Sequence, residues 1–474
     1  MGCAGNAAAR TPNLDRVAAE GVRFTRCSTN SPLCMPARVS LISGQHVSQH
    51  GIWGNNLVAT DRHGPSHVRN IRDAGYRTAV IGKTHLWANH KLDGHTRDHE
   101  HILKDWGYEY AHELRDVVPS SRCDCYYADF LAERGSLHIY QDYARTYWRG
   151  FHPWETPPCQ LPLEEHIDIY CANRAAEWIT NYQDEEPFYL QVCFTGPHTP
   201  FDSTPAYRYQ FKPEEMPLCI MDPPAKPVSP QVQRQLKQSR LQEMTESQSR
   251  MMTSFYYAKV CMLDYGIGLV LQALEKRGML DNTWIIYTSD HGEMLGDHRL
   301  NQKNVFYESA LNVPLIIRPP GGTQALQASG LTDHLDVCAT LIDAAKAEPL
   351  TGSSGVSLLP KLAGGSYPDK GKDVVFSEVK VGAYYAMGRD ENYKMTIDSV
   401  TQQPVELYDM VSDPRELANL VNEPSLGNLR DEFMDEYFSQ LLANHDEAKR
   451  TIYDEAEHAP LTETFMHELM RRSP

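Results

Sequence analysis

The hydrophobic and polar positions of the chain follow two patterns that alternate along most of its length. Residues 77–82, 187–194 and 283–288 are short, mostly apolar runs that end at polar or turn-forming residues, as buried strands do. Residues 166–182 and 254–276 carry apolar side chains along one helical face, which predicts helices that pack against a sheet. Strands that alternate with helices in this way favour an α/β domain.

The pattern changes after about residue 370, where short apolar runs replace the long helical stripes. Four of these runs predict antiparallel strands, at residues 374–376, 383–387, 393–395 and 405–408, and helices close the chain. A chain of 474 residues is also too long for one simple core. We therefore expect a larger α/β domain over residues 1–368 and a smaller α+β subdomain over residues 369–474.

Two polar stretches interrupt the alternation of strands and helices. Residues 86–160 are rich in His, Tyr, Trp and Asp without a clean period, which predicts loops and short helices around a pocket. Residues 203–250 include a Gln-, Ser- and Arg-rich tract from Ser229 to Arg250, which we interpret as a mobile lid.

Composition excludes some classes of function. The net charge is −17, from 45 basic and 62 acidic residues, which argues against nucleic-acid binding and requires a local basic pocket for any anionic substrate. No apolar run is long enough to span a membrane. Eleven scattered cysteines do not suggest a disulfide framework and favour a reducing compartment such as the cytoplasm. A periplasmic location is the alternative if a signal peptide precedes the sequence.

A cysteine stands at the start of a predicted helix. Pro36 suits the first turn of a helix that continues to Ser43 and ends at Gly44. Cys34 would lie at its N-terminus, where backbone amides and the helix dipole favour negative charge, and Arg38 would lie one turn further on the same side. A buried structural cysteine is the alternative.

Polar residues follow three of the predicted strands directly. Lys83 and His85 follow residues 77–82, His198 follows residues 187–194 between two prolines, and Asp290 and His291 follow residues 283–288. Catalytic groups gather where strands end in an open α/β sheet. A carboxylate and an imidazole side by side can also bind one cation. The alternatives are a solvated lysine, structural loop histidines and an aspartate that caps a turn.

Together these segments resemble the type I sulfatases of the alkaline-phosphatase superfamily. The resemblance rests on Cys-x-Pro-x-Arg at 34–38, "GYRTAVIGKTHL" at 75–86, "PHTP" at 197–200, "TSDHGE" at 288–293 and "ELYDMVSDPRELANL" at 406–420. It covers nearly the whole chain, with the motifs in the expected order. It implies an alkaline-phosphatase-like central mixed sheet flanked by helices, with a smaller C-terminal α+β subdomain.

The resemblance also implies roles for single residues. Cys34 would be oxidised to formylglycine by a maturation enzyme, and the hydrated aldehyde would be the nucleophile that Arg38 holds in place. The residues expected to bind the sulfate, stabilise the nucleophile or protonate the leaving oxygen are Lys83, His85, His198 and Lys303. Asn55, otherwise a loop asparagine that forms a turn, matches an asparagine that contacts substrate. An unremarkable exposed lysine is the alternative for Lys303.

The same motifs imply a metal site. Asp290, His291 and the residue derived from Cys34 would bind a divalent cation, with Ca²⁺ expected and Mn²⁺ or Mg²⁺ as alternatives. In the family, a hydrophobic strand with a paired aspartate precedes the segment that corresponds to residues 11–24. We therefore expect the natural chain to extend upstream of Met1, and the alternative is that the protein has lost half of a metal site.

Three functions remain open at this stage. The first is a sulfuric ester hydrolase that acts on a small sulfated carbohydrate or aryl ester. The second is a phosphonate monoester or phosphodiester hydrolase with the same nucleophile. The third is a non-catalytic relative that binds anions, because the acidic upstream ligands are missing from this sequence. Oligomeric state and exact substrate are not readable from the residues.

Overall fold

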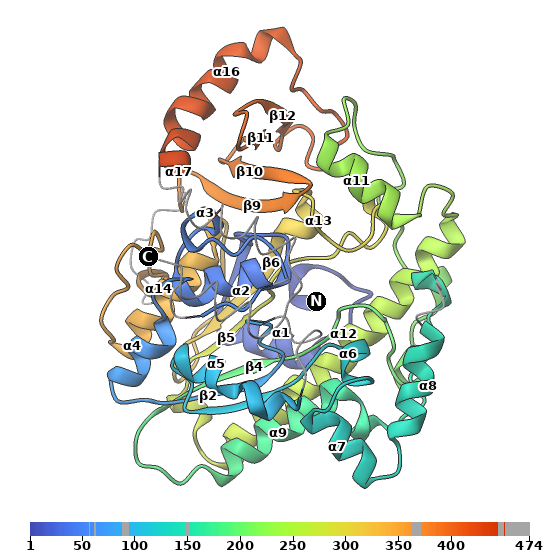
Figure 1. The fold of residues 1–474 in the computed structure, drawn as a ribbon, viewed down its shortest axis with the longest axis vertical. Helices are drawn as coiled ribbons and strands as arrows, with labels where there is room; N and C mark the ends of the chain where they lie inside the picture. The colour runs from blue at the N-terminus through green and yellow to red at the C-terminus, as the bar shows by residue number, and fades with distance from the viewer. Residues whose placement is uncertain are drawn as a thin grey trace.

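The computed structural model describes residues 1–55, 57–60, 63–87, 94–147, 152–362, 371–443 and 450. Two sheets form the centre of the larger domain, and a third sheet forms a separate layer near the C-terminus (Figure 1). Helices cover the central sheets on both sides. This arrangement agrees with the α/β architecture expected from the hydrophobic pattern.

The first central sheet has five strands. Its order is β5 (Ile285–Thr288), β6 (Asn312–Arg318), β1 (Val22–Ser28) and β7 (Leu326–Ala328), with β8 (Thr332–Asp333) also paired to β1. Strand β6 runs antiparallel to β5 and β1, with Val22 opposite Ile317, whereas β7 and β8 run parallel to β1. The sheet is therefore mixed, as expected.

The second central sheet has three parallel strands. Its order is β3 (Tyr110–Glu113), β2 (Arg77–Gly82) and β4 (Phe188–Cys193). Alternate side chains of β2 point to opposite faces: Val80 packs with Val39 and Val68, and Ile81 packs with Cys171. Both faces of this sheet are thus covered, which explains the continuous apolar run in β2.

Two long helices cover one side of the central sheets, and a group of shorter helices covers the other. Helices α9 (Ile167–Asn181) and α12 (Glu246–Lys276) lie against each other beneath β4, and α2 (Cys34–Ser43), α4 (His67–Asp73) and α14 (His334–Ala345) pack together on the opposite side. The remaining helices are α1 (Pro12–Ala19), α3 (Val47–His50), α5 (Glu100–Asp105), α6 (Val117–Ser120), α7 (Tyr126–Glu133), α8 (Leu137–Tyr147), α10 (Pro205–Arg208), α11 (Pro230–Ser239), α13 (Glu308–Leu311) and α15 (Leu359–Leu362).

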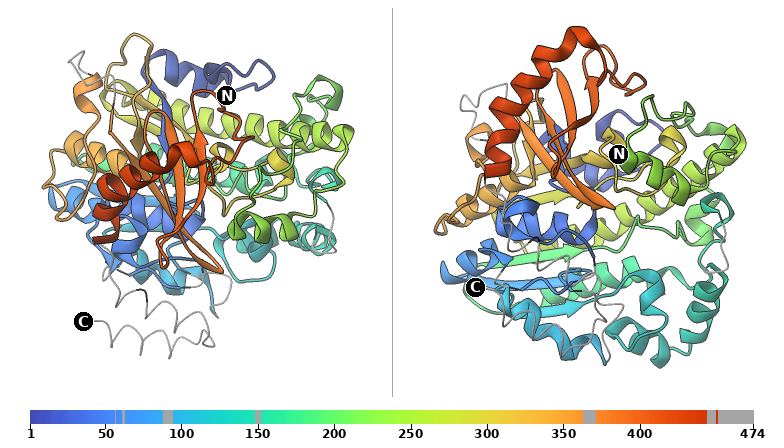
Figure 2. Two further views of the ribbon diagram at one scale, coloured as in Figure 1. Left: turned by 90° about the horizontal axis from the view of Figure 1, so that it is seen from above. Right: turned by 45° about the horizontal axis from the view of Figure 1, so that its top comes forward.

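The C-terminal sheet has four antiparallel strands in the order β12 (Pro404–Asp409), β11 (Tyr393–Asp398), β10 (Ala383–Arg389) and β9 (Val375–Val381). It stands apart from the central sheets, with α16 (Gly427–Glu432), a π-helical segment (Phe433–Phe438) and α17 (Ser439–Ala443) packed on it (Figure 2). All four predicted strands are present. The predicted domain boundary at residue 368 lies outside the described residues.

The polar stretch at residues 203–250 is more ordered than the predicted lid. It contains α10, α11 and the first turn of α12, which begins at Glu246 rather than at Ser254. The polar side chains Gln231 and Gln235 of α11 are buried because they donate hydrogen bonds to the carbonyls of Asn304 (2.7 Å) and Asn301 (2.8 Å). These two glutamines are therefore polar because they bind the backbone of the loop at residues 301–304.

Helix α12 is long and apolar enough, by length and composition alone, to cross a membrane, although the sequence pattern did not indicate this. Half of the most apolar 18-residue segment of α12 is buried inside the protein, and the helix packs against α9. Core helices of this length commonly show the same composition.

An elongated cavity separates the two central sheets. Strand β4 pairs with β2 and β5 pairs with β6, and the facing edges of β4 and β5 have no strand partner among the described residues. The cavity between them measures about 1060 Å³, and its walls include Leu190, Ile267 and Ile286. Every residue of β4 and β5 is partly exposed, whereas most of β2 is buried.

A buried ion-pair cluster joins the C-terminal sheet to the larger domain. The ammonium group of Lys394 in β11 contacts Glu416 and lies 3.2 Å from Glu308 of α13. We expect Lys394→Met to lower the free energy of unfolding by about 3–5 kcal/mol, because the buried Glu416 loses its cation and Glu308 keeps only Arg389 among the described residues. Urea titration measures this loss, with the exposed Lys276→Met as a control expected to change little. A loss below about 1 kcal/mol would contradict the role assigned to the cluster.

Candidate functional site

The site is built around Cys34, the first residue of α2. Pro36 and the residues after it form the helix as expected, and Leu33 precedes it in an extended conformation. Cys34 is 2% exposed, and its Sγ lies 3.2 Å from Nε2 of His291. Burial alone would raise the pKa of this thiol, but Lys303, Lys83 and His291 together hold it well below its ordinary value. The surroundings of Cys34 therefore favour negative charge.

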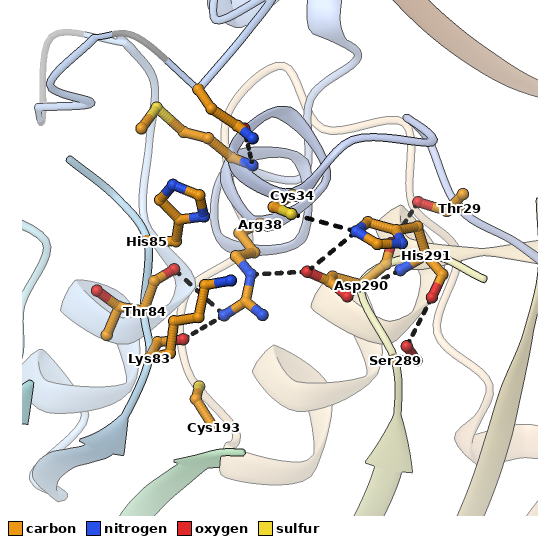
Figure 3. Close-up of polar contacts among 12 residues, drawn as sticks. Thr29, Cys34, Arg38, Lys83, Thr84, His85, Cys193, Ser289, Asp290 and His291 are labelled. Atoms are coloured by element: carbon orange, nitrogen blue, oxygen red, sulfur yellow. Dashed lines mark hydrogen bonds and ion pairs between the residues drawn. The ribbon is translucent and has the colours of Figure 1, made fainter. Parts of the chain in front are cut away.

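Arg38 connects the Cys34 helix to the ends of two strands. Its Nε donates to Oδ2 of Asp290 over 2.9 Å, and its Nη1 donates to the carbonyls of Lys83 and Thr84 (Figure 3). Asp290 follows β5, and Lys83 follows β2. Although burial would raise the pKa of the Asp290 carboxyl, Arg38 and His291 keep it well below its usual range.

Lys83 and His85 lie on one side of Cys34 (Figure 3). The ammonium group of Lys83 is buried and donates to both carboxylate oxygens of Asp116, each over 2.7 Å. His85 faces Cys34, and its Nδ1 is buried without a hydrogen-bond partner among the described residues. Burial lowers the pKa of His85, so its ring is neutral at physiological pH.

His198 and Lys303 complete the basic side of the pocket. His198 Nδ1 lies 2.7 Å from the carbonyl oxygen of Thr199, so the neutral ring donates there and keeps Nε2 free. Burial and the nearby Lys303 lower the pKa of His198 to about 4. Lys303 is 4% exposed and forms no ion pair within 4 Å with the described residues, although Cys34 helps to raise its pKa above the ordinary value despite burial. The exposed-lysine alternative for Lys303 is therefore wrong.

Asn55 lies beside the start of α2. Its Oδ1 accepts a hydrogen bond from the backbone N–H of Met35 over 3.0 Å. This contact satisfies one of the amides that a helix leaves unpaired at its first turn. The structure thus gives Asn55 a capping contact.

The sequence analysis missed two carboxylates of the site. Asp116 pairs with Lys83, and Glu113 at the end of β3 accepts backbone hydrogen bonds from Thr84 (3.1 Å) and His85 (3.5 Å). Burial raises the pKa of Glu113 to about 7. The stretch that holds both was interpreted as loops. The signal available was the short run at residues 110–113, whose strand places its carboxyl end beside that of β2.

Three donors converge where a cation is expected. Atoms of Cys34, Asp290 and His291 that could bind a metal lie within 4.8 Å of one another. His291 Nδ1 lies 2.8 Å from the carbonyl of Gly292, which fixes the tautomer with Nε2 free to bind. Calcium takes six to eight oxygen ligands, and among these three side chains only Asp290 offers an oxygen. Most positions around a calcium ion would therefore be left to other groups.

The pocket as a whole suits an anion next to a nucleophile. Two buried lysines, two neutral imidazoles and the N-terminus of α2 surround Cys34 on a protein whose net charge is −17. Among the described residues only Lys83 of these two lysines has a carboxylate partner. An anionic group bound beside Cys34 would supply the missing partner for Lys303.

Comparisons with known proteins agree with this geometry. The family model described as "Sulfatase" matches residues 1–347, and a model described as "N-sulphoglucosamine sulphohydrolase, C-terminal" matches residues 296–444. An arylsulfatase of Clostridium perfringens is 26% identical over 434 residues, which is 89% of this chain and 87% of that protein.

Solved structures show the same fold. A phosphonate monoester hydrolase of Agrobacterium radiobacter superposes with a TM-score of 0.75 at 24% identity, over 94% of this chain and 93% of the other. A protein solved with its substrate D-glucosamine-2-N,6-O-disulfate superposes with a TM-score of 0.70 at 21% identity, over 97% of each chain. The alkaline-phosphatase-like fold is therefore confirmed. Because the sulfatase model matches well over half of the sequence, the chain belongs to the sulfatase family of enzymes.

Proposed function

We propose that this protein hydrolyses sulfate esters through an oxygen nucleophile derived from Cys34. The observation that carries the proposal is the buried, unpaired ammonium group of Lys303 next to Cys34. A buried cation without a partner is costly, and a bound sulfate group would compensate it. We expect the substrate to be a small sulfated carbohydrate or an aryl sulfate, as the names of the similar proteins suggest.

Oxidation of Cys34 by a maturation enzyme supplies the reactive group. Hydrated formylglycine offers one hydroxyl for attack on sulfur and a second through which the covalent sulfate can later be expelled. The position of Cys34 at the N-terminus of α2 favours the negative charge that such a nucleophile carries. Arg38 would hold the nucleophile in place from one turn below.

The surrounding side chains would bind the sulfate, orient the reacting groups and protonate the leaving oxygen. Lys83 and Lys303 would bind the sulfate oxygens and stabilise the charge that develops on them. His85 and Asn55 would orient the nucleophile and the substrate through their free ring nitrogen and amide. His198, when protonated at its otherwise free Nε2, would donate that proton to the leaving oxygen.

A divalent cation, expected to be Ca²⁺ with Mn²⁺ or Mg²⁺ as alternatives, would polarise the sulfate and lower the pKa of the nucleophile. Asp290, His291 and the residue derived from Cys34 would supply part of the ligands of this cation. A further strand between β4 and β5 would supply more ligands. The apolar cavity there has unpaired strand edges and opens at Cys34, Asp290 and His291, so such a strand would end at the cation site. This supports the expectation that the natural chain extends upstream.

Phosphonate monoester or phosphodiester hydrolysis is the second candidate. The same nucleophile, Asn55 and the Asp290–His291 pair suit both reactions, and a phosphonate monoester hydrolase is among the similar structures. Parallel assays of a phenyl phosphonate ester and an aryl sulfate separate the two. A non-catalytic anion-binding role is the third candidate, and it predicts binding of sulfate without turnover.

The first prediction concerns Cys34. We expect the protein, produced together with a maturation enzyme, to hydrolyse 4-nitrophenyl sulfate and to carry an aldehyde at Cys34 in peptide mass spectrometry. Cys34→Ala should lower kcat by about 10⁴-fold or more, because the covalent pathway is lost. Cys261→Ala, which alters a half-buried cysteine outside the site, should keep the activity. An active Cys34→Ala variant would contradict a mechanism in which the nucleophile derives from Cys34.

The second prediction concerns the protonation of His198. Its pKa of about 4 leaves few protonated rings at neutral pH, and this fraction grows as the pH falls. For an alkyl sulfate, whose leaving oxygen needs a proton, kcat/KM should rise about tenfold per pH unit from pH 7 towards pH 5. His198→Ala should remove this rise at low pH. With 4-nitrophenyl sulfate, whose leaving oxygen needs no proton, the protein with His198 should show the rise only weakly and the variant should not show it. A flat profile for the alkyl sulfate would rule out the acid role.

The third prediction concerns the proposed additional strand. Peptide mapping of the protein from its natural source should reveal residues upstream of Met1 that include an apolar run followed by acidic side chains. That form should contain close to one equivalent of divalent cation by elemental analysis, and chelation should abolish its activity. A natural chain that starts at Met1 yet retains a full equivalent of metal would exclude the strand as a source of ligands.

A further inference from the structure

A buried cluster of charged side chains lies beneath the loop that carries His198. Lys259 of α12, Asp168 of α9 and Asp202 are each at most 1% exposed, as is His166. The ammonium group of Lys259 contacts Asp202 Oδ1 and lies 3.2 Å from Asp168 Oδ2. It also lies 3.4 Å from His166 Nε2. None of the residues assigned to the catalytic site above belongs to this cluster.

The two carboxylates hold opposite ends of the His198 loop. Asp168 Oδ1 accepts hydrogen bonds from the Thr195 amide (3.0 Å), the Thr195 hydroxyl (2.8 Å) and the Gly196 amide (2.8 Å). Asp202 is itself part of the chain after His198 and is bound by Lys259. One cation therefore joins the carboxylate that binds the start of the loop to the carboxylate at its end.

The loop backbone rests directly on this ion pair. A Cβ atom placed on Gly196 would lie 2.8 Å from Lys259 Cε and 2.8 Å from Asp168 Oδ2. The hydrogen bond of His198 goes to the carbonyl of Thr199 in the same loop. The orientation of the imidazole is thus set by the path of the loop, and the path of the loop is set by the cluster.

The cluster does not need a metal ion. Ligand atoms of Cys159, His166 and Asp202 lie within 4.8 Å of one another, which is close enough for a cation. The Lys259 ammonium contacts two of those three groups and supplies the positive charge itself. Burial would raise the pKa values of Asp168 and Asp202, but Lys259 and His166 lower both, so the carboxylates stay ionised.

We propose that Lys259 is a positioning residue for His198: its buried ammonium group ties both ends of the 195–202 loop and so fixes the imidazole against the substrate. This assignment rests on the proposed sulfatase activity, in which His198 serves the leaving oxygen. Without the ion pairs of Lys259 to Asp168 and Asp202, the loop could shift. A displacement of about 1 Å of a catalytic group can cost on the order of 100-fold in rate.

A double-mutant cycle between Lys259 and His198 tests the proposal. Lys259→Met should lower kcat for an alkyl sulfate by about 10-fold to 100-fold in the otherwise natural protein. In the His198→Ala background the same change should cost less than about twofold, because the group being positioned is gone. Equal losses in both backgrounds would overturn the proposal. Lys259→Arg, which keeps the charge, should recover part of the activity.

Two further variants separate positioning from general stability. Lys394→Met also removes a buried cation between two carboxylates, but in the C-terminal sheet, so its effect should be the same in both backgrounds. If Lys259→Met does not fold, the charge-balanced pair Asp202→Asn with Lys259→Met replaces it in the cycle, because it leaves no additional buried charge. The same non-additivity with His198→Ala is expected.

Hydrogen–deuterium exchange gives a readout that does not depend on turnover. The Thr195 and Gly196 amides should exchange faster in Lys259→Met and in the charge-balanced pair, whereas amides in the middle of α9 and α12 should not change. Unchanged exchange in the loop would contradict the proposed tie. If the loop loosens but the natural protein does not hydrolyse sulfate esters, the structural role stands and the proposed function fails.

Discussion

The arrangement of the site depends on the partly buried ion pair between Arg38 and Asp290. These two residues come from the Cys34 helix and from the end of β5, and the same guanidinium also donates to carbonyls that follow β2. The two central sheets share no strand pairing among the described residues, so Arg38 is a direct polar connection between their ends. A guanidinium suits this task because it stays charged and presents several donors in a fixed plane.

The charge around Cys34 is opposite in sign to the net charge of the protein. The chain is strongly acidic overall, yet Lys83, Lys303 and the N-terminus of α2 face the same small volume as Cys34. The two lysines are not equivalent: Asp116 already neutralises Lys83, whereas Lys303 has only the long-range attraction of Cys34 and nearby carboxylates. This asymmetry is suited to one bound anion with a single negative charge on the reacting group, which is the charge of a sulfate ester and equally of a phosphonate monoester or a phosphodiester.

Three loops of the proposed active site are held by buried polar side chains from a neighbouring element. Glu113 binds the amides beside His85, Gln231 and Gln235 bind carbonyls on either side of Lys303, and Asp168 with Lys259 binds the loop of His198. In each case the side chain that reaches the pocket sits on irregular backbone, and the hydrogen bonds come from a helix or strand. Rigid elements thereby place loop residues with the accuracy that catalysis requires.

The sequence by itself determined which residues stand at strand ends and therefore most of the site. Lys83 and His85 follow β2 and His198 follows β4, and these two parallel strands bring their carboxyl ends to one edge. Asp290 and His291 follow β5 of the other central sheet, and Arg38 links Asp290 to the end of β2. Cys34 at a helix start followed from local proline chemistry. Local patterns of this kind survive in the fold because they depend on a few adjacent residues.

Only the tertiary structure decided the partners of these residues. Asp116 and Lys259 carry no local signal that separates them from ordinary polar residues, since each acquires its role from a side chain far away in the sequence. The short run at residues 110–113 marks a strand end at Glu113, but the amides that Glu113 binds are also distant in the sequence. The polar tract that holds the buried glutamines of α11 was interpreted as a mobile lid or excursion for the same reason. Periodicity reports whether a position is apolar, but a buried polar position looks solvated until the group that satisfies its hydrogen bonds is known.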